Sequence, residues 1–222
     1  MVEPHKKKAR SMLSKAILFC LSVGLLCIPA AQVSAQSGTV TLPRNAPPVL
    51  SNFYSYKGAN GLRRTSRHQG LDVGGPNGMP ILAAADGVVV ETDIGTCWGP
   101  TVVIDHGTGI DGKPLIAAYG HVGAIRVKPG QRVKRGQTIA ALGNNHKDFK
   151  CIYGVRHLHL QIGRQHRSGS KGTYWGHVKY LVDGRKGVNP HDYWADGPGR
   201  VTCFRKGVTY PAGTLTYPAP CR

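Results

Sequence analysis

Acidic residues are scarce in this chain, which has 11 aspartates and glutamates against 29 lysines and arginines and a formal net charge of +18. Part of the excess lies near the N-terminus. Residues 36–222 still hold 24 basic and 10 acidic residues, so their net charge is +14. A body this basic favours anionic partners, among them nucleic acid, a membrane surface or a polyanionic cell wall.

Long amphipathic helical patterns are also lacking. The chain is instead rich in turn residues, with 30 glycines and 15 prolines. Strand-like runs bounded by Gly, Pro or Asn occupy residues 81–94, 101–107, 115–122, 131–142 and 157–163. Since no helix alternates with these runs, the sequence predicts a mainly β fold, an antiparallel β-sheet joined by hairpins with few or no long helices.

One long apolar run is present, and no second one follows it. It spans residues 16–31, after a basic stretch and before the small residues of "VSA" at 33–35. This order is typical of a cleaved signal peptide, residues 1–35. A membrane anchor is the alternative, but the run is short for a span and contains Gly24 and Pro29. We expect an exported protein that meets the membrane only through its signal peptide, with residues 36–49 as an extended linker.

Cysteine pairs with the CxxC spacing are missing, which argues against a cysteine metal site. Beyond the signal peptide the chain keeps an even number of cysteines, which suggests two disulfides formed in an oxidising compartment. Three pairings are possible for Cys97, Cys151, Cys203 and Cys221. Cys203 and Cys221 flank a short segment rich in Gly, Pro and Thr, so we expect them to close a terminal loop. Cys97 and Cys151 would then join two loops of the domain.

The stretch "GVRHLHLQIG", residues 154–163, places two histidines in an apolar strand-like run. Successive strand side chains point to opposite faces, so His157 and His159 share one face and the leucines take the other. Residues i and i+2 of a strand lie about 6.6 Å apart along the chain. This separation favours one ring on a metal ion and the other ring beside it.

Two other segments offer partners for such an ion. "RHQGLDV" places His68 and Asp72 four residues apart, about 13 Å in a straight strand. Gly70 opposes a helix, so a bend near Gly70 would have to bring the two side chains together. His121 follows another strand-like run in "YGHV". Each signal alone is weak, because a chance pair in a surface loop or a hydrogen-bonded structural histidine explains it as well.

Taken together, "HQGLD", "YGH" and "HLH" occur in this order, with "VVIDHG" and "VKPGQRVKRGQTIAALGN" between them. The set resembles the lysostaphin-like, LytM-type zinc metallopeptidases, which are peptidoglycan endopeptidases, over roughly residues 50–165. The resemblance implies an antiparallel β-sheet with a groove over one Zn²⁺ ion per chain. It places the zinc ligands at His68, Asp72 and His159 and the catalytic residues at His121 and His157. We expect a metallopeptidase domain over residues 50–195 and a disulfide-tied extension over residues 196–222.

A glutamate base is not available, because the chain has no HExxH motif. His121 and His157 are therefore expected to share proton transfer and oxyanion stabilisation. Many family members have a tyrosine shortly before the first zinc histidine, where it helps to hold the oxyanion. Here Arg63, Arg64 and Arg67 stand in that region, so the helper is left unidentified.

The remaining histidines are interpreted as structural. His106 would be a turn residue or a support for a metal ligand, and Asp105 would either orient a ligand or cap a hairpin. The others lie in polar sequence and are expected to be surface or locally hydrogen-bonded residues: His146, His166, His177 and His191.

The leading hypothesis is a monomeric, periplasmic or secreted endopeptidase whose partners are the stem peptides and cross-bridges of peptidoglycan. The alternative is a non-catalytic LytM-type regulator that activates other wall hydrolases. Such regulators typically lack some zinc ligands. A nucleic-acid binder is disfavoured, because no recognisable nucleic-acid motif is present and the basic loop 167–180 can equally be a groove wall. Glycine bridges, D-Ala to diaminopimelate cross-links and non-wall proteins all stay open as substrates.

Overall fold

The computed structural model of the protein describes residues 39–95, 97–166 and 187–222. Every described residue belongs to one compact unit, which spans residues 37–222. The expected signal peptide, the basic loop 167–180 and His177 lie outside the described residues. Within the described ranges, no helix is both long enough and apolar enough to cross a membrane.

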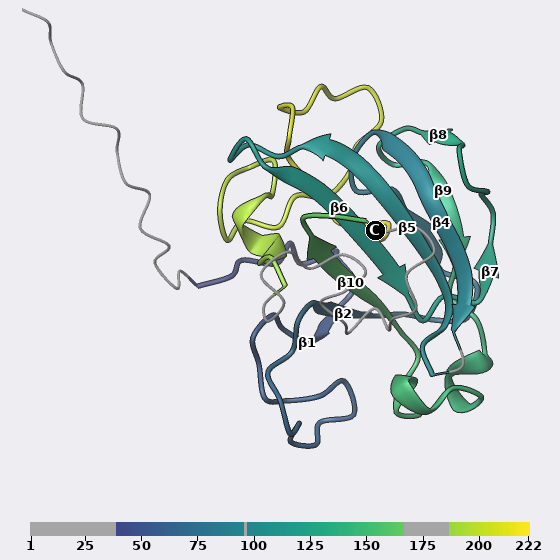
Figure 1. Ribbon diagram of the computed structural model, residues 1–222. Helices are drawn as coiled ribbons and strands as arrows, with labels where there is room; N and C mark the ends of the chain where they lie inside the picture. Colours follow the sequence, from purple (N-terminus) through teal and green to yellow (C-terminus); the bar gives the residue numbers. More distant parts are fainter. Residues whose placement is uncertain (1–38, 96, 167–186) are drawn as a thin grey trace, which may run out of the picture. The chain divides into compact units, whose positions relative to one another are not determined.

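Two antiparallel sheets form the domain (Figure 1). The larger sheet has the strand order β1 (Val49–Ser51), β2 (Leu71–Gly74), β10 (His157–Gly163), β6 (Pro114–Gly120), β5 (Gly99–Thr108), β4 (Gly87–Gly95) and β8 (Arg132–Val133). The smaller sheet has the order β3 (Pro80–Leu82), β9 (Thr138–Ala141) and β7 (Ala124–Ile125). In the described residues the helical elements are three 3₁₀ turns: η1 (Asn145–Lys147), η2 (Lys150–Ile152) and η3 (Pro190–Asp192). The prediction of a mainly antiparallel β fold is confirmed.

Two of the expected strands are each split into a pair of strands. The run 81–94 becomes β3 and β4, and the run 131–142 becomes β8 and β9. In both runs the earlier and later halves join different sheets, because β3 pairs with β9 while β4 pairs with β8. A turn at Gly136, which has a φ of 77°, separates the second pair. The two sheets are therefore connected by corners that the apolar pattern did not reveal.

The hydrophobic core lies on one face of β10 and its neighbours. Leu158, Leu160 and Ile162 are fully buried there, together with Leu71 of β2 and Tyr119 of β6. Burial of each such side chain contributes about 1.5–3 kcal/mol to stability. The intervening positions of β10 therefore face the other side of the sheet, as the period of two predicts.

Segments at both ends of the described chain pack against this core. Trp194, Leu215 and Tyr217 are fully buried members of the core cluster, although they lie in the segment after residue 187. Val40 and Leu42 pack against the same cluster from residues 39–49. The two segments also meet each other through a β-bridge between Thr41 and Arg200. Residues 187–222 are thus part of the domain's structural core.

Both expected disulfides are present. Cys97 pairs with Cys151 across 54 residues, and Cys203 pairs with Cys221 across 18 residues. The second bond ties the end of the chain to the segment that supplies Leu215 and Tyr217 to the core. The pairing that was expected from the sequence is confirmed.

Removing the Cys203–Cys221 bond is expected to lower the free energy of unfolding by about 3 kcal/mol, because a loop of this length loses its constraint on the unfolded chain. The double variant Cys203→Ser/Cys221→Ser can be compared with the unaltered protein by urea unfolding under oxidising conditions. Replacing the exposed Val208 in the same loop by alanine serves as the control, with a change within about 0.5 kcal/mol. Equal unfolding midpoints for the disulfide variant and the control would show that the bond does not stabilise the domain.

Candidate metal centre

The register between β2 and β10 brings two of the expected ligands together. His159 lies directly opposite Asp72 in this antiparallel pair, and His157 lies opposite Gly74. Directly opposed side chains on one face of a sheet lie about 4.5–5.5 Å apart at Cβ. Asp72 and His159 therefore meet as a consequence of strand pairing, although they are 87 residues apart in the chain.

A bend before β2 brings in His68. The chain bends at Gln69 and Gly70, as the sequence predicted, and His68 Nε2 reaches to 3.1 Å from Asp72 Oδ1. Gly70 is required for space: a Cβ atom there would lie 2.8 Å from the His159 ring and closer still to the Leu160 carbonyl oxygen. The absent side chain at Gly70 therefore lets the bend pack directly on the strand that carries His159.

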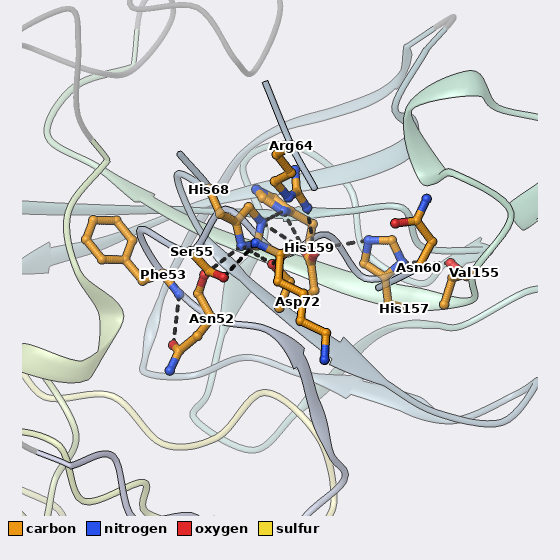
Figure 2. A network of polar contacts seen from close by, with 12 residues as sticks. Asn52, Phe53, Ser55, Asn60, Arg64, His68, Asp72, Val155, His157 and His159 are labelled. Carbon is orange, nitrogen blue, oxygen red and sulfur yellow. Dashed lines mark hydrogen bonds and ion pairs between the residues drawn. The ribbon is translucent and has the colours of Figure 1, made fainter. Parts of the chain in front are cut away.

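Three candidate ligand atoms form a compact triangle in Figure 2. His159 Nδ1 lies 2.8 Å from Asp72 Oδ1 and 3.0 Å from His68 Nε2, and the third side measures 3.1 Å. All three side chains are buried. A triangle of about 3 Å sides allows one ion to lie roughly 2.0–2.1 Å from every corner, the range of zinc bonds to imidazole and carboxylate.

Hydrogen bonds behind His68 determine which of its nitrogens faces the triangle. His68 Nδ1 lies 3.0 Å from the Asn52 carbonyl oxygen and 3.0 Å from Ser51 Oγ. The Ser51 hydroxyl donates to the Lys57 carbonyl oxygen, so both partners of Nδ1 act as acceptors. Nδ1 therefore carries the proton, and the lone pair of Nε2 points at the triangle.

A similar contact orients His159 in the opposite sense. His159 Nε2 lies 3.0 Å from the amide oxygen of Gln161, which can only accept a hydrogen bond. The proton is then on Nε2, and the Nδ1 lone pair faces the triangle. Two imidazole lone pairs and a carboxylate oxygen thus converge on one point, an arrangement that repels itself unless a cation lies between them. The residues present fit a divalent metal ion of the zinc type.

Asp72 is held from its outer side by an arginine. Arg64 Nη2 lies 2.9 Å from Asp72 Oδ2, which leaves Oδ1 for the two histidines. Burial would raise the pKa of Asp72, but the close approach of His157, His159 and His68 outweighs it. The pKa is held well below its usual value, so the carboxylate is ionised.

His157 and His121 flank the triangle. His157 Nε2 lies 3.6 Å from Asp72 Oδ1, and the His121 ring centroid lies 4.9 Å from that of His157. His157 Nδ1 donates to the Val155 carbonyl oxygen and His121 Nδ1 donates to that of Trp98, so each ring keeps a lone pair on Nε2. Burial lowers the pKa of both rings, which are therefore neutral at pH 7 and able to accept a proton.

The backbone at His121 is unusual. Its φ is 65°, in the left-handed region that residues other than glycine rarely adopt. Non-glycine residues in this region cost of order 1–3 kcal/mol and cluster at functional sites. This conformation turns the chain at the end of β6 and directs the His121 ring toward His157 and His159.

Trp98 forms a wall of the site. Its ring centroid lies 4.9 Å from that of His159 and 5.1 Å from that of His121. Gly120 leaves room for it, since a Cβ atom there would lie 2.8 Å from the indole ring. The adjacent Cys97–Cys151 bond ties the Trp98 segment to η2.

Several residues of the site were missed by the sequence reasoning. Gln161 follows His159 by two positions, so the same strand period places it on the site face and would have indicated it. Arg64 was noted only as a departure from the family pattern. No local signal marked Ser51 or Asn52, which lie 17 and 16 residues before the histidine they contact.

Two other residues have structural contacts away from the triangle. His106 bonds the Asp86 carbonyl oxygen and the Tyr119 hydroxyl, and burial lowers its pKa to about 4. Asp105 accepts a hydrogen bond from the Gly107 amide. This contact matches the second of its two expected roles, the cap of a hairpin. Elsewhere, His166 pairs with Glu91 at 2.8 Å.

His191 was expected to be either a surface residue or a locally hydrogen-bonded one. It is 5% exposed and bonds to its near neighbours Asn189 and Trp194, so the second role holds. Trp194 Nε1 donates to His191 Nδ1, which leaves the proton on Nε2 to be donated to the Asn52 side-chain oxygen at 2.6 Å. Asn52 in turn accepts from His68 through its backbone carbonyl. The segment after residue 187 therefore reaches the metal centre through one intermediate residue.

Replacing His191 by phenylalanine is expected to weaken zinc binding roughly three- to tenfold, because Asn52 loses the donor that fixes its orientation behind His68. His191→Gln, which can still donate to Asn52, should recover most of the loss. Tyr193→Phe is the control, since its hydroxyl contacts Asp111 and not Asn52. Zinc affinity measured against a competing chelator separates this effect from stability. Lower stability with unchanged affinity would argue against the positioning role.

The fold and the site thus define a β protein with two buried imidazoles and one carboxylate that could hold a metal ion. Residues 66–171 match peptidase family M23. The chain therefore contains an M23 domain, and the resemblance inferred from its motifs is confirmed.

By their names, the curated relatives include both peptidoglycan endopeptidases and NlpD-type proteins. The chain is 38% identical over 101 residues to the lipoprotein NlpD/LppB homolog of Pseudomonas aeruginosa, covering 45% of this chain and 30% of that protein. It is 35% identical over 114 residues to the peptidoglycan DD-endopeptidase ShyA of Vibrio cholerae, covering 51% and 24%. It is 32% identical over 97 residues to the murein hydrolase activator NlpD of Salmonella dublin, covering 43% and 22%. The chain thus spans less than a third of the length of these relatives.

Among solved structures, the catalytic domain of the prophage-encoded M23 protein EnpA from Enterococcus faecalis, crystallised as a point mutant, is 25% identical. It covers 66% of this chain and 95% of that domain, with a TM-score of 0.44. The family assignment rests on the sequence match over residues 66–171.

Proposed function

We propose that this protein is an exported zinc-dependent endopeptidase that hydrolyses peptide cross-links of bacterial peptidoglycan. The observation that carries the proposal is the convergence of His68, Asp72 and His159 on one point beside two neutral histidines. These three residues would hold the ion, and three is the number of protein ligands typical of catalytic zinc sites. A bound zinc ion supplies Lewis acidity, which activates water near neutral pH and polarises a carbonyl group.

The protein's own residues then handle the protons. His157 and His121 present the Nε2 lone pairs of neutral rings next to the ligand triangle, so together they can accept the proton released by attacking water and return it to the leaving amine nitrogen. Their carbonyl partners, Val155 and Trp98, keep each Nδ1 protonated and hold the ring orientation. The Trp98 ring limits access of bulk water from its side.

The oxidising compartment that the disulfides indicate and the positive net charge of the protein both support a cell-wall substrate. Two disulfides are stable in a periplasm or outside the cell and rare in a reducing cytosol. The net charge of +14 over residues 36–222 favours approach to an anionic polymer. We propose a monomer that takes peptidoglycan stem peptides and cross-bridges as its partners.

A regulator that activates other wall hydrolases is the second candidate, favoured by the relative named murein hydrolase activator. The complete ligand set and both flanking histidines favour the enzyme. Digestion of purified cell walls by the zinc-loaded protein, with and without chelator, tests the proposal. We expect release of peptide fragments that the chelator abolishes. Stoichiometric zinc binding without any release would favour the regulator.

A further inference from the structure

The first part of the loop between β1 and β2, residues 52–67, is strongly cationic. It contains one lysine and three arginines and no acidic residue: Lys57, Arg63, Arg64 and Arg67. Arg64 forms an ion pair with the buried Asp72, which compensates its charge. Within the described part of the chain, neither Arg63 nor Arg67 has a carboxylate partner. Two uncompensated guanidinium groups thus lie on the segment that leads into the first metal ligand.

Aromatic stacking holds these two guanidinium groups in place. The Arg67 guanidinium carbon lies 4.5 Å from the ring centroid of Tyr56 and 4.9 Å from that of Tyr54, and Arg67 Nη1 donates to the Tyr54 carbonyl oxygen. The Arg63 guanidinium carbon lies 4.7 Å from the centroid of Tyr56. Arg63, Arg67 and Tyr56 are exposed to solvent. Cation–π contacts orient a guanidinium group and leave N–H donors at its edge for a ligand.

The loop is also fixed to the metal centre by backbone hydrogen bonds. The Tyr54 amide donates to the His68 carbonyl oxygen at 2.8 Å, and the His68 amide donates to the Ser55 carbonyl oxygen at 3.0 Å. The Arg64 amide donates to the Tyr56 carbonyl oxygen at 2.7 Å. These bonds fix the backbone of the loop, so the stacked arginines have a defined position relative to His68.

We infer that Arg63 and Arg67 form a carboxylate-binding subsite beside the metal centre, which selects peptides that carry a free carboxylate near the scissile bond over uncharged peptide bridges. The planar fork of a guanidinium group matches the two oxygens of a carboxylate. Pre-orientation by the tyrosines lowers the entropy lost when the ligand binds. This inference rests on the proposed function, since it names the substrate class of the same site.

The test compares two peptides that differ in one functional group. Each is a cross-linked peptide dimer containing diaminopimelate, with the carboxylate next to the cross-link either free or converted to a carboxamide. Binding is measured by fluorescence anisotropy with analogues in which a reduced, non-hydrolysable linkage replaces the scissile amide. Cleavage of the parent amides is measured separately. Loss of cleavage with retained selective binding would contradict the proposed enzyme and leave the subsite supported.

The zinc-loaded protein is expected to bind the free carboxylate roughly five- to tenfold more tightly than the carboxamide, and added salt should reduce the preference because the arginines are exposed. The double variant Arg63→Gln/Arg67→Gln should lose the preference to within about twofold. Arg126→Gln/Arg132→Gln is the matched control, because it removes two exposed arginines, one of them on β8 at the opposite edge of the larger sheet.

Three outcomes would overturn the inference. The first is equal binding of the two peptides by the unaltered protein. The second is a double variant that keeps the full preference, or a control that loses it. The third is that poly(glycerol phosphate) binds the unaltered protein and not the double variant while the two peptides bind alike, which would make the loop a site for phosphate polymers.

Discussion

Replacing His159 by alanine is expected to remove both zinc binding and cleavage, whereas replacing His157 by alanine is expected to remove cleavage and spare the metal. The two histidines share one strand and one face, but only His159 contributes a corner of the ligand triangle. Loss of one of three ligands should weaken zinc binding by more than about 100-fold, beyond the range seen for residues that merely support a ligand. Loss of a proton-transfer group should lower kcat by about 10²–10⁴-fold.

The measurement is zinc affinity by chelator competition together with turnover of a cross-linked peptide, for both variants on the same preparation. Circular dichroism shows whether each variant is folded. An equal loss of zinc affinity in the two variants would mean that His157 is also a ligand. Full activity of His157→Ala would remove it from proton transfer.

Replacing Gly70 by alanine is expected to damage the metal centre although no ligand residue is replaced. The added methyl group would overlap the Leu160 carbonyl oxygen and the His159 ring, and neither can move without breaking the pairing of β2 with β10. We expect the free energy of unfolding to fall by about 3 kcal/mol, the upper end for overpacking. Zinc affinity should fall as well, because the bend that brings His68 to Asp72 must open.

The matched control is Gly130→Asn. Gly130 has a φ of 81° and no neighbouring atom within 4 Å of an added Cβ, and asparagine tolerates this backbone region. Urea unfolding of the metal-free proteins separates the stability effect from the metal effect. A Gly70→Ala protein as stable as the control, with unchanged zinc affinity, would contradict the packing at the bend.

The sequence predicted correctly those features of the site that depend on the conformation of a few neighbouring residues. The period of two in "HLHLQIG" placed His157 and His159 on the face opposite Leu158, and the buried leucines confirm that alternation. Gly70 between His68 and Asp72 indicated a bend, and the structure has one. The cysteine spacing also predicted both disulfides correctly.

Contacts between distant segments were beyond such reasoning. His191 looked like a residue of a polar loop, because nothing in "NPHDYW" shows that Asn52 closes over it from 139 residues away. The runs 81–94 and 131–142 looked like single strands, because their division between two sheets is decided by tertiary pairing. Local patterns predicted which strand face carries the candidate ligands. The hydrogen-bond partners that fix each imidazole tautomer could be identified only from the folded structure.

Muropeptide analysis tests the central claim most directly. Purified, defined peptidoglycan is digested with the zinc-loaded protein, and the released fragments are identified by mass spectrometry. We predict fragments with newly freed amino groups at the cleaved cross-links, which disappear on addition of chelator and in His159→Ala. A protein that binds one zinc ion per chain and yet leaves every peptide cross-link intact would contradict the account.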